Sequence, residues 1–295
     1  MLRILSRLAV GVAVYLVIVL FGTSLPLAAG MMLTFPALNG LAFFFSERAS
    51  VAPIARTMLW MPLINGALCA LYIVLFLALA PVQAPALLAW GLLGLLVVLW
   101  LVIVTRRWVA RGVALEHQFV YAVACTLAGL ALTVAAMVFL GRPGIGAPAG
   151  SLGGSPAAAF ILDTIGKNGI KIVLFALCLL AFLLASAARA IPDWIRGILA
   201  GLPIIPFGGL VSLSADGAIA VEERLQIFRA MAASVWLSPA VPIWFVWGLA
   251  RFYGARQPSR TRARDDAVRF LALVLGWLFC FLVILAVSFA VASFW

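Results

Sequence analysis

Two asparagines stand inside long apolar runs of the sequence, each three residues after a proline and directly before a glycine. A proline inside a helix lacks a backbone N–H, and it frees the carbonyl four residues earlier. In lipid, a freed backbone group needs a partner or a water-lined cavity. These residues therefore offer hydrogen bonds in mid-membrane, either to a substrate or to a neighbouring helix. The two sets are Pro36, Asn39 and Gly40, and Pro62, Asn65 and Gly66.

A second group of helix-breaking residues lies in the other half of the chain, and Pro206 follows Pro36 by 170 positions. One interpretation is that the broken helix ends meet halfway through the bilayer and line a substrate path. The other is that the kinks and small residues serve only close helix packing. Because the kinks are paired, we favour the path. The second group comprises Pro206, Gly208, Gly209, Ser238 and Pro239.

The sequence offers little for catalysis, metal binding or a cofactor. Every carboxylate stands at the end of an apolar run, whereas proton-coupled carriers bury at least one Asp, Glu or His. The single histidine, His117, follows Glu116 in a polar connection, where we expect it to be solvated. The four cysteines have no CxxC spacing and read as packing residues. We therefore expect a protein that is not an enzyme and that has no cofactor and no metal site.

Composition defines the elements that must position these residues. The chain has 295 residues, of which 66% are hydrophobic and only 10% are charged, so we expect an all-α polytopic membrane protein. Its excess of arginine lies at the ends of apolar runs, which argues against nucleic acid as a partner. Charged residues separate nine predicted spans, at about 4–22, 30–46, 57–80, 86–105, 118–140, 169–188, 197–214, 229–250 and 270–294.

The distribution of basic residues predicts the orientation. With a cytoplasmic N-terminus, fifteen of the twenty Lys and Arg residues fall on the cytoplasmic side, as the positive-inside rule requires. We therefore expect a bacterial inner-membrane protein with its N-terminus inside and its C-terminus outside. Span 1 also has the basic start and apolar run of a signal peptide, and whether it is cleaved stays open.

The chain contains an internal repeat. Arg229 follows Arg56, and Met231 follows Met58, by 173 positions each, so spans 1–4 match spans 6–9. Five crossings separate equivalent points, so the two copies have opposite orientations in the bilayer, as in many transporters. We expect a first repeat at 1–112, span 5 with a flexible outer loop at 113–156, and a second repeat at 157–295. The segments 47–56 and 215–228 are predicted to be loops on opposite sides of the membrane.

Both hairpins share a small residue before an apolar run, a proline in mid-span, a polar loop and a third helix that starts with arginine. The segments are AGMMLTFPALNGLAFFFSERASVAPIARTMLWMPLINGALCALY and, from Ala200, AGLPIIPFGGLVSLSADG continuing to FRAMAASVWLSPAVPIWFVW. This pattern resembles GlpM-like proteins, small bacterial inner-membrane proteins of about four spans. The resemblance implies two such units fused in opposite orientations, and it assigns no functional residue.

Three functions fit these observations. The first is a transporter or flippase for a small neutral, anionic or lipid-linked substrate, with its path between spans 2, 3, 7 and 8. The second is a structural or assembly subunit of an envelope polysaccharide or lipid system, and the third is a passive channel. Membrane lipids and a small-molecule or lipid-linked substrate are the expected partners. The substrate, the coupling ion and the oligomeric state stay open.

Overall fold

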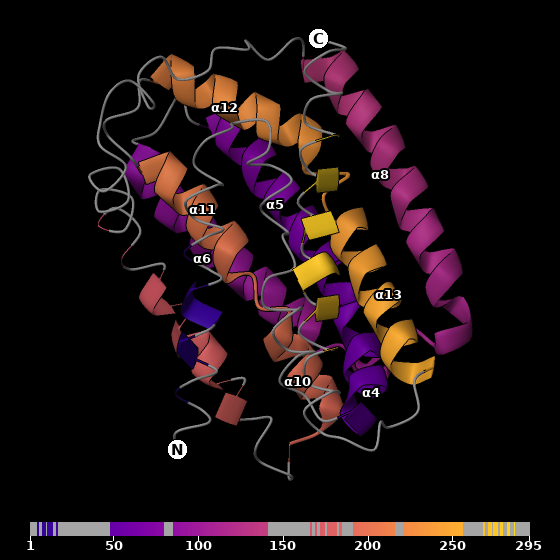
Figure 1. The fold of residues 1–295 in the computed structure, drawn as a ribbon. Coiled ribbons are helices and arrows are strands. Elements are labelled where there is room, and N and C mark those ends of the chain that lie inside the picture. The colour runs from indigo at the N-terminus through magenta and orange to yellow at the C-terminus, as the bar shows by residue number, and fades with distance from the viewer. Residues whose placement is uncertain are drawn as a thin grey trace.

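The computed structural model describes residues 48–79, 85–140, 191–215 and 221–255, with scattered helical residues and short helical runs from 5 to 16, from 166 to 184 and from 268 to 286. Almost all of these residues are helical, and none of them lies in a strand (Figure 1). The predicted all-α class is therefore confirmed for the described part of the chain. The candidate residues Pro36, Asn39 and Gly40, the predicted span 30–46 and the outer loop lie outside the described residues.

Within the described part of the chain, three helices are long and apolar enough to cross a membrane: Ser50–Leu79, Ala86–Val104 and Leu115–Ala136. They contain α5 (Trp60–Leu79), most of α6 (Pro85–Val104) and most of α8 (Gln118–Leu140). These elements match the predicted spans 57–80, 86–105 and 118–140. Each sequence is rich in Leu and Ala and has no charged residue, which favours a continuous helix in an apolar environment.

The prediction of a loop at 47–56 is wrong, because residues 48–56 belong to a helix, α4 (Arg48–Met58). Val51, Ile54, Ala55 and Met58 recur on one face of it, and each is at most 2% exposed. This spacing of three and four residues is the pattern of an amphipathic helix, which the nearby charges had concealed. The helix packs against α10 (Asp193–Ala200) and α13 (Ala240–Ala255).

The predicted span 197–214 is two helices rather than one. After α10 ends, the chain passes through Gly201, Leu202 and Pro203 before α11 (Ile204–Ala215) begins. A proline makes the helical conformation unfavourable for the residue before it, so we expect a break at Leu202. Gly201 is packed against the side chain of Met61, where a larger residue would not fit.

The predicted span 229–250 is also interrupted, and the predicted loop 215–228 is partly helical. The helix α12 (Val221–Ser234) begins inside that loop, and five residues in a turn separate it from α13. Pro239 lies in this turn and supplies no N–H to the carbonyl of Val235, so the first helix cannot continue.

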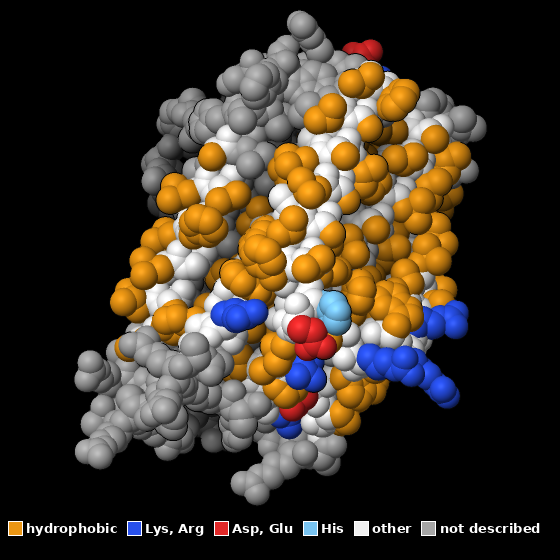
Figure 2. Space-filling view, turned by 90° about the vertical axis from the view of Figure 1, so that its right-hand side faces the viewer, with side chains coloured by type: hydrophobic (Ala, Val, Ile, Leu, Met, Phe, Trp, Pro, Cys, Tyr) orange, Lys and Arg blue, Asp and Glu red, His pale blue; other side chains and the backbone are white. Residues whose placement is uncertain are grey.

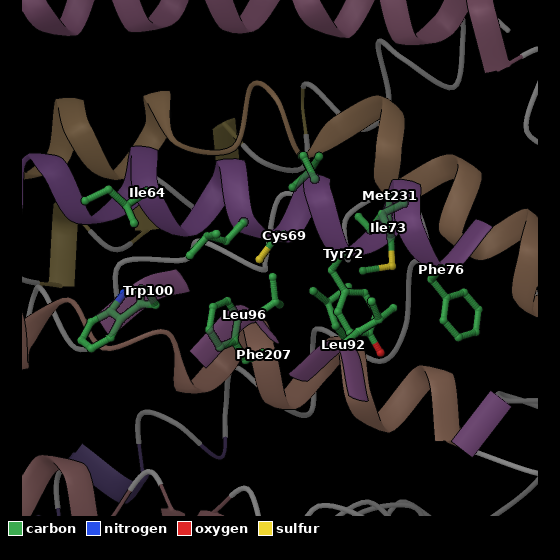
Figure 3. Close-up of a cluster of buried hydrophobic side chains, with 14 of the residues drawn as sticks. Ile64, Cys69, Tyr72, Ile73, Phe76, Leu92, Leu96, Trp100, Phe207 and Met231 are labelled. Carbon is green, nitrogen blue, oxygen red and sulfur yellow. The ribbon is translucent and has the colours of Figure 1, made fainter. Parts of the chain in front are cut away.

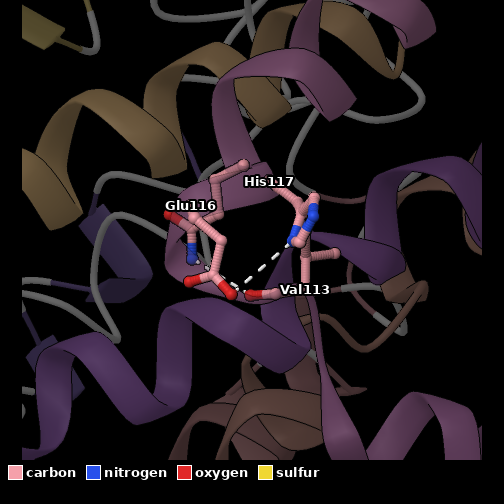
Figure 4. Close-up of polar contacts among 4 residues, drawn as sticks. Val113, Glu116 and His117 are labelled. Atoms are coloured by element: carbon pink, nitrogen blue, oxygen red, sulfur yellow. Dashed lines mark hydrogen bonds and ion pairs between the residues drawn. The ribbon is translucent and has the colours of Figure 1, made fainter.

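A short polar connection joins α6 to α8. It contains α7 (Arg107–Arg111), the 3₁₀-helix η1 (Leu115–His117) and Gly112, whose φ of 68° is a left-handed value. The side-chain amide of Gln118 donates to the carbonyl of Val113 at 3.2 Å and caps this turn (Figure 4). The Nδ1 atom of His117 lies 3.8 Å from the Oε1 atom of Glu116, and both side chains are more than 70% exposed. This exposure agrees with a solvated histidine.

Two groups of buried side chains hold the helices together. One lies among α4, α8, α10 and α13, and the other joins α5 and α6 to α11 and α12. In the second group, Tyr72 of α5 lies beside Leu92 of α6, and Phe207 of α11 lies beside Leu96 of α6 (Figure 3). Phe228 of α12 completes it, with its ring centroid 4.6 Å from that of Phe76.

The outward faces of α6 and α8 are apolar. Leu87 is 72% exposed and Phe139 is 86% exposed, so these side chains face the surroundings rather than the core. Figure 2 shows hydrophobic side chains over most of one face, with charged side chains gathered toward its lower end. Such a band of exposed large hydrophobic residues suits contact with lipid.

Candidate functional site

Asn65 of α5 lies between the break at Gly201 and the helix α6. Its side-chain nitrogen donates to the carbonyl of Gly201 at 2.9 Å, in the break between α10 and α11. Its side-chain oxygen accepts from the indole N–H of Trp100 on α6, at 3.1 Å. The asparagine is 7% exposed, so both ends of its amide are used in helix–helix contacts. In this conformation Asn65 bonds protein groups rather than an open path.

Gly66 lies directly beside Pro239, in the break between α12 and α13. A methyl group at Gly66 would overlap the ring of Pro239, and it would also lie 3.3 Å from the ring atom Cδ. Both residues are buried. Among the candidate residues, Gly66 and Pro239 are thus in direct contact and close the site on this side.

Two backbone carbonyls near the site accept hydrogen bonds from side chains. The carbonyl of Leu59, between α4 and α5, accepts from the hydroxyl of Tyr121 on α8 at 3.0 Å. The carbonyl of Val235, which Pro239 leaves free, accepts from the hydroxyl of Ser238 at 2.6 Å. At Val235 a side chain thus replaces the missing N–H group, as an apolar environment requires.

The proline and glycines of α11 do not break a helix. Pro206 is the third residue of α11, where a helix has no partner for a backbone N–H anyway. The interruption lies instead at Gly201–Pro203, so the expected kink at Pro206 is displaced upstream. Pro206 is buried, and Gly208 and Gly209 are half-buried on the same helix. The buried hydroxyl of Ser214, farther along α11, lies 2.7 Å from that of Tyr72.

Trp100, Gly201 and Tyr121 were not expected at the site. Each makes its contact across more than thirty residues of sequence, and no motif announces the pairing. The only sequence hint is indirect, since a tryptophan N–H or a tyrosine hydroxyl inside an apolar run needs a partner. Which carbonyl or amide supplies it depends on how the helices pack.

The described residues hold no group of three His, Cys, Asp or Glu side chains that would suit a metal ion. Cys69, Cys125 and Cys178 are free thiols. The site is therefore made of amide, hydroxyl, indole and backbone groups. Such groups can orient a neutral or anionic ligand or hold helices together.

No family model matches the chain, and no similar curated protein or solved structure was found. The resemblance to GlpM-like proteins therefore stays an expectation.

Proposed function

We propose that this chain is a membrane transporter or flippase for an amphiphilic or lipid-linked substrate, and that the structure is a closed state of it. The observation that carries the proposal is the convergence of helix breaks at Asn65 and Gly66. Asn65 binds the backbone of the break at Gly201, and Gly66 contacts the break at Pro239. Breaks in mid-membrane are where transporters commonly place substrate groups and hinges.

An inverted repeat is the second part of the proposal, and three observations support it. The helix α12 begins 173 positions after α4, the same offset that relates Arg229 to Arg56. Gly66 and Pro239, also 173 positions apart, touch each other, as residues near a two-fold axis do. The helix α4 contacts α13, and α5 contacts α12. A two-fold axis that relates α4 to α12 and α5 to α13 would convert each of these contacts into the other.

The ends of the helices support the proposed orientation. In Figure 1, α4 and α10 lie at one end of the molecule and α12 lies at the other. The exposed Arg56 belongs to the first end, where its carbonyl accepts from the N–H of Val113 at 2.9 Å. The exposed Arg229 belongs to α12. This separation fits an inner-membrane protein with a cytoplasmic N-terminus and equivalent segments on opposite sides.

Transport requires the closed contacts to open. Interhelical hydrogen bonds in membranes contribute only about 0.6 kcal/mol on average, so the Asn65 bonds can be exchanged during a cycle. Removing them would favour the open state by a few-fold, because a contact made in one state alone shifts the balance between states.

The test is translocation of a fluorescent phosphatidylglycerol in vesicles that contain the purified full-length chain. Dithionite bleaches only the outer leaflet, so we expect more than half of the label to be lost, against half in protein-free vesicles. Asn65→Ala should change the rate of lipid translocation several-fold if the chain transports this lipid. If the chain does not transport it, the substitution should leave the bleaching unchanged. Bleaching that stops at half for this lipid and for a labelled phosphatidylethanolamine would overturn the flippase proposal.

A structural or assembly subunit of an envelope polysaccharide or lipid system is the second candidate. The side-chain amide of Asn65 favours it, since both of its hydrogen bonds serve helix packing. In that case Asn39→Ala combined with Asn65→Ala should leave function intact, while changes on the outer face of α8 should abolish it. Envelope integrity in cells that carry each variant distinguishes the two candidates.

A further inference from the structure

An apolar groove of about 800 Å³ lies beside α13, away from Asn65. It runs along this helix toward Leu249, and residues of α8 and described residues between 275 and 283 also line it. Its volume is in the range of small-molecule sites. Side chains that line it include Leu130, Leu237, Val241, Phe245, Leu275 and Phe279.

The groove has the depth of one membrane leaflet. From Ala240 to Leu249 the helix rises about 14 Å, at about 1.5 Å per residue. Half of a hydrocarbon core measures about 15 Å. A lining of this length with almost no polar groups suits an acyl chain of a single leaflet.

Polar groups gather at one end of the groove. Arg251 is exposed, and its guanidinium carbon lies 5.8 Å from the ring centre of Trp247, which lines the groove. The indole N–H of Trp247 is buried and has no hydrogen-bond partner in the structure. Deeper in the groove the polar groups are already paired, because Trp244 donates to the hydroxyl of Thr126 at 2.8 Å.

We propose that this groove binds an anionic phospholipid, with one acyl chain along α13 and the phosphate at Arg251, beside the ring of Trp247. The cation calls for a group with negative charge, and the apolar lining calls for a hydrocarbon chain. A tryptophan at the boundary between chain and headgroup is in the place that this side chain prefers in membranes. The site does not depend on transport, since a resident lipid would bind a structural protein equally well.

Gly248 makes the proposal testable without disturbing the fold. It lines the groove, and a Cβ added there would meet no atom within 4 Å. Gly248→Leu should therefore fill the groove while leaving the helix packing intact. Gly91 on α6 is the matched control, since its added Cβ also meets nothing and it does not line the groove.

The experiment measures lipids retained by the full-length protein in native mass spectrometry, after reconstitution with equal phosphatidylglycerol and phosphatidylcholine. We expect wild type and Gly91→Leu to keep phosphatidylglycerol and Gly248→Leu to lose most of it. Arg251→Gln should lower the preference for phosphatidylglycerol about five-fold, the effect of one cation at a membrane surface.

Equal retention by wild type and Gly248→Leu would overturn the site. A change from dimer to monomer in Gly248→Leu, with no change in bound lipid, would also overturn it, because the groove would then hold a second copy of the chain. Retention of phosphatidylglycerol by a protein that moves no labelled lipid would keep this site and remove only the transport proposal.

Discussion

Gly66 of α5 packs against the ring of Pro239, which stands 173 residues later at the equivalent point of the second proposed repeat. Gly66 lacks a side chain and Pro239 lacks a backbone N–H, and each property shapes this contact. The glycine lets two backbones approach, and the proline ends the turn before α13. This contact links the first half of the chain to the second.

Gly66→Ala should destabilise the protein by about 1–3 kcal/mol, because the added methyl group overlaps the Pro239 ring in a packed interface. Thermal unfolding in detergent measures the effect. Gly94→Ala on α6 is the control, since its added Cβ meets nothing and alanine favours helix over glycine by up to about 1 kcal/mol. Equal melting temperatures for Gly66→Ala and wild type would contradict the close contact.

Asn65 and Trp100 should be energetically coupled. A double-mutant cycle with Asn65→Ala and Trp100→Phe should give a coupling energy of about 0.6–1.7 kcal/mol, the range found for interhelical hydrogen bonds in membranes. Trp90→Phe is the matched control, because Trp90 stands on the same helix and is 62% exposed. A coupling energy of zero would mean that the bond at 3.1 Å contributes nothing.

Arg56 and Glu222 should be reachable from opposite sides of the membrane. Both are exposed, one on α4 and one on α12. In a chain without its native cysteines, an impermeant maleimide should label Glu222→Cys from outside, and Arg56→Cys only after the membrane is opened. Labelling of both from one compartment would end the inverted-repeat proposal.

Gly112→Ala should be among the most damaging single changes in the polar connection. Its φ of 68° suits glycine, and an added Cβ would lie 2.7 Å and 2.8 Å from the carbonyl carbon and oxygen of Arg56. Backbone atoms cannot move aside easily, so we expect a loss of about 1–3 kcal/mol. Protease resistance of the folded protein reports it, with Gly94→Ala as reference. Unchanged resistance would show that the turn adapts.

The three uninterrupted helices were predictable because their sequence carries the whole cause. In α5, α6 and α8 a run of apolar helix formers with no charge meets the length of a bilayer, and no distant contact is needed to decide the structure. The prediction at α4 failed because its charged residues masked a buried stripe. Val51, Ile54 and Met58 show that stripe only when α10 and α13 cover it.

The candidate site was predictable in part. Pro239 and Gly66 announced a break and a close approach, since those residue types have few other uses inside an apolar run. The prediction of a break at Pro206 was wrong, because the sequence alone does not distinguish a proline in the first turn of a helix from one in mid-helix. The break lies at Gly201 and Pro203, so Pro206 falls in the first turn of α11.

The sequence alone determined the helical class, the three long apolar helices and the residue types at the breaks, because these follow from local composition and backbone chemistry. Only the tertiary structure decided which groups those residues bind. Asn65 carries a donor and an acceptor in any fold. That they meet Gly201, 136 residues away, and Trp100 follows from the packing of α5 against the other helices.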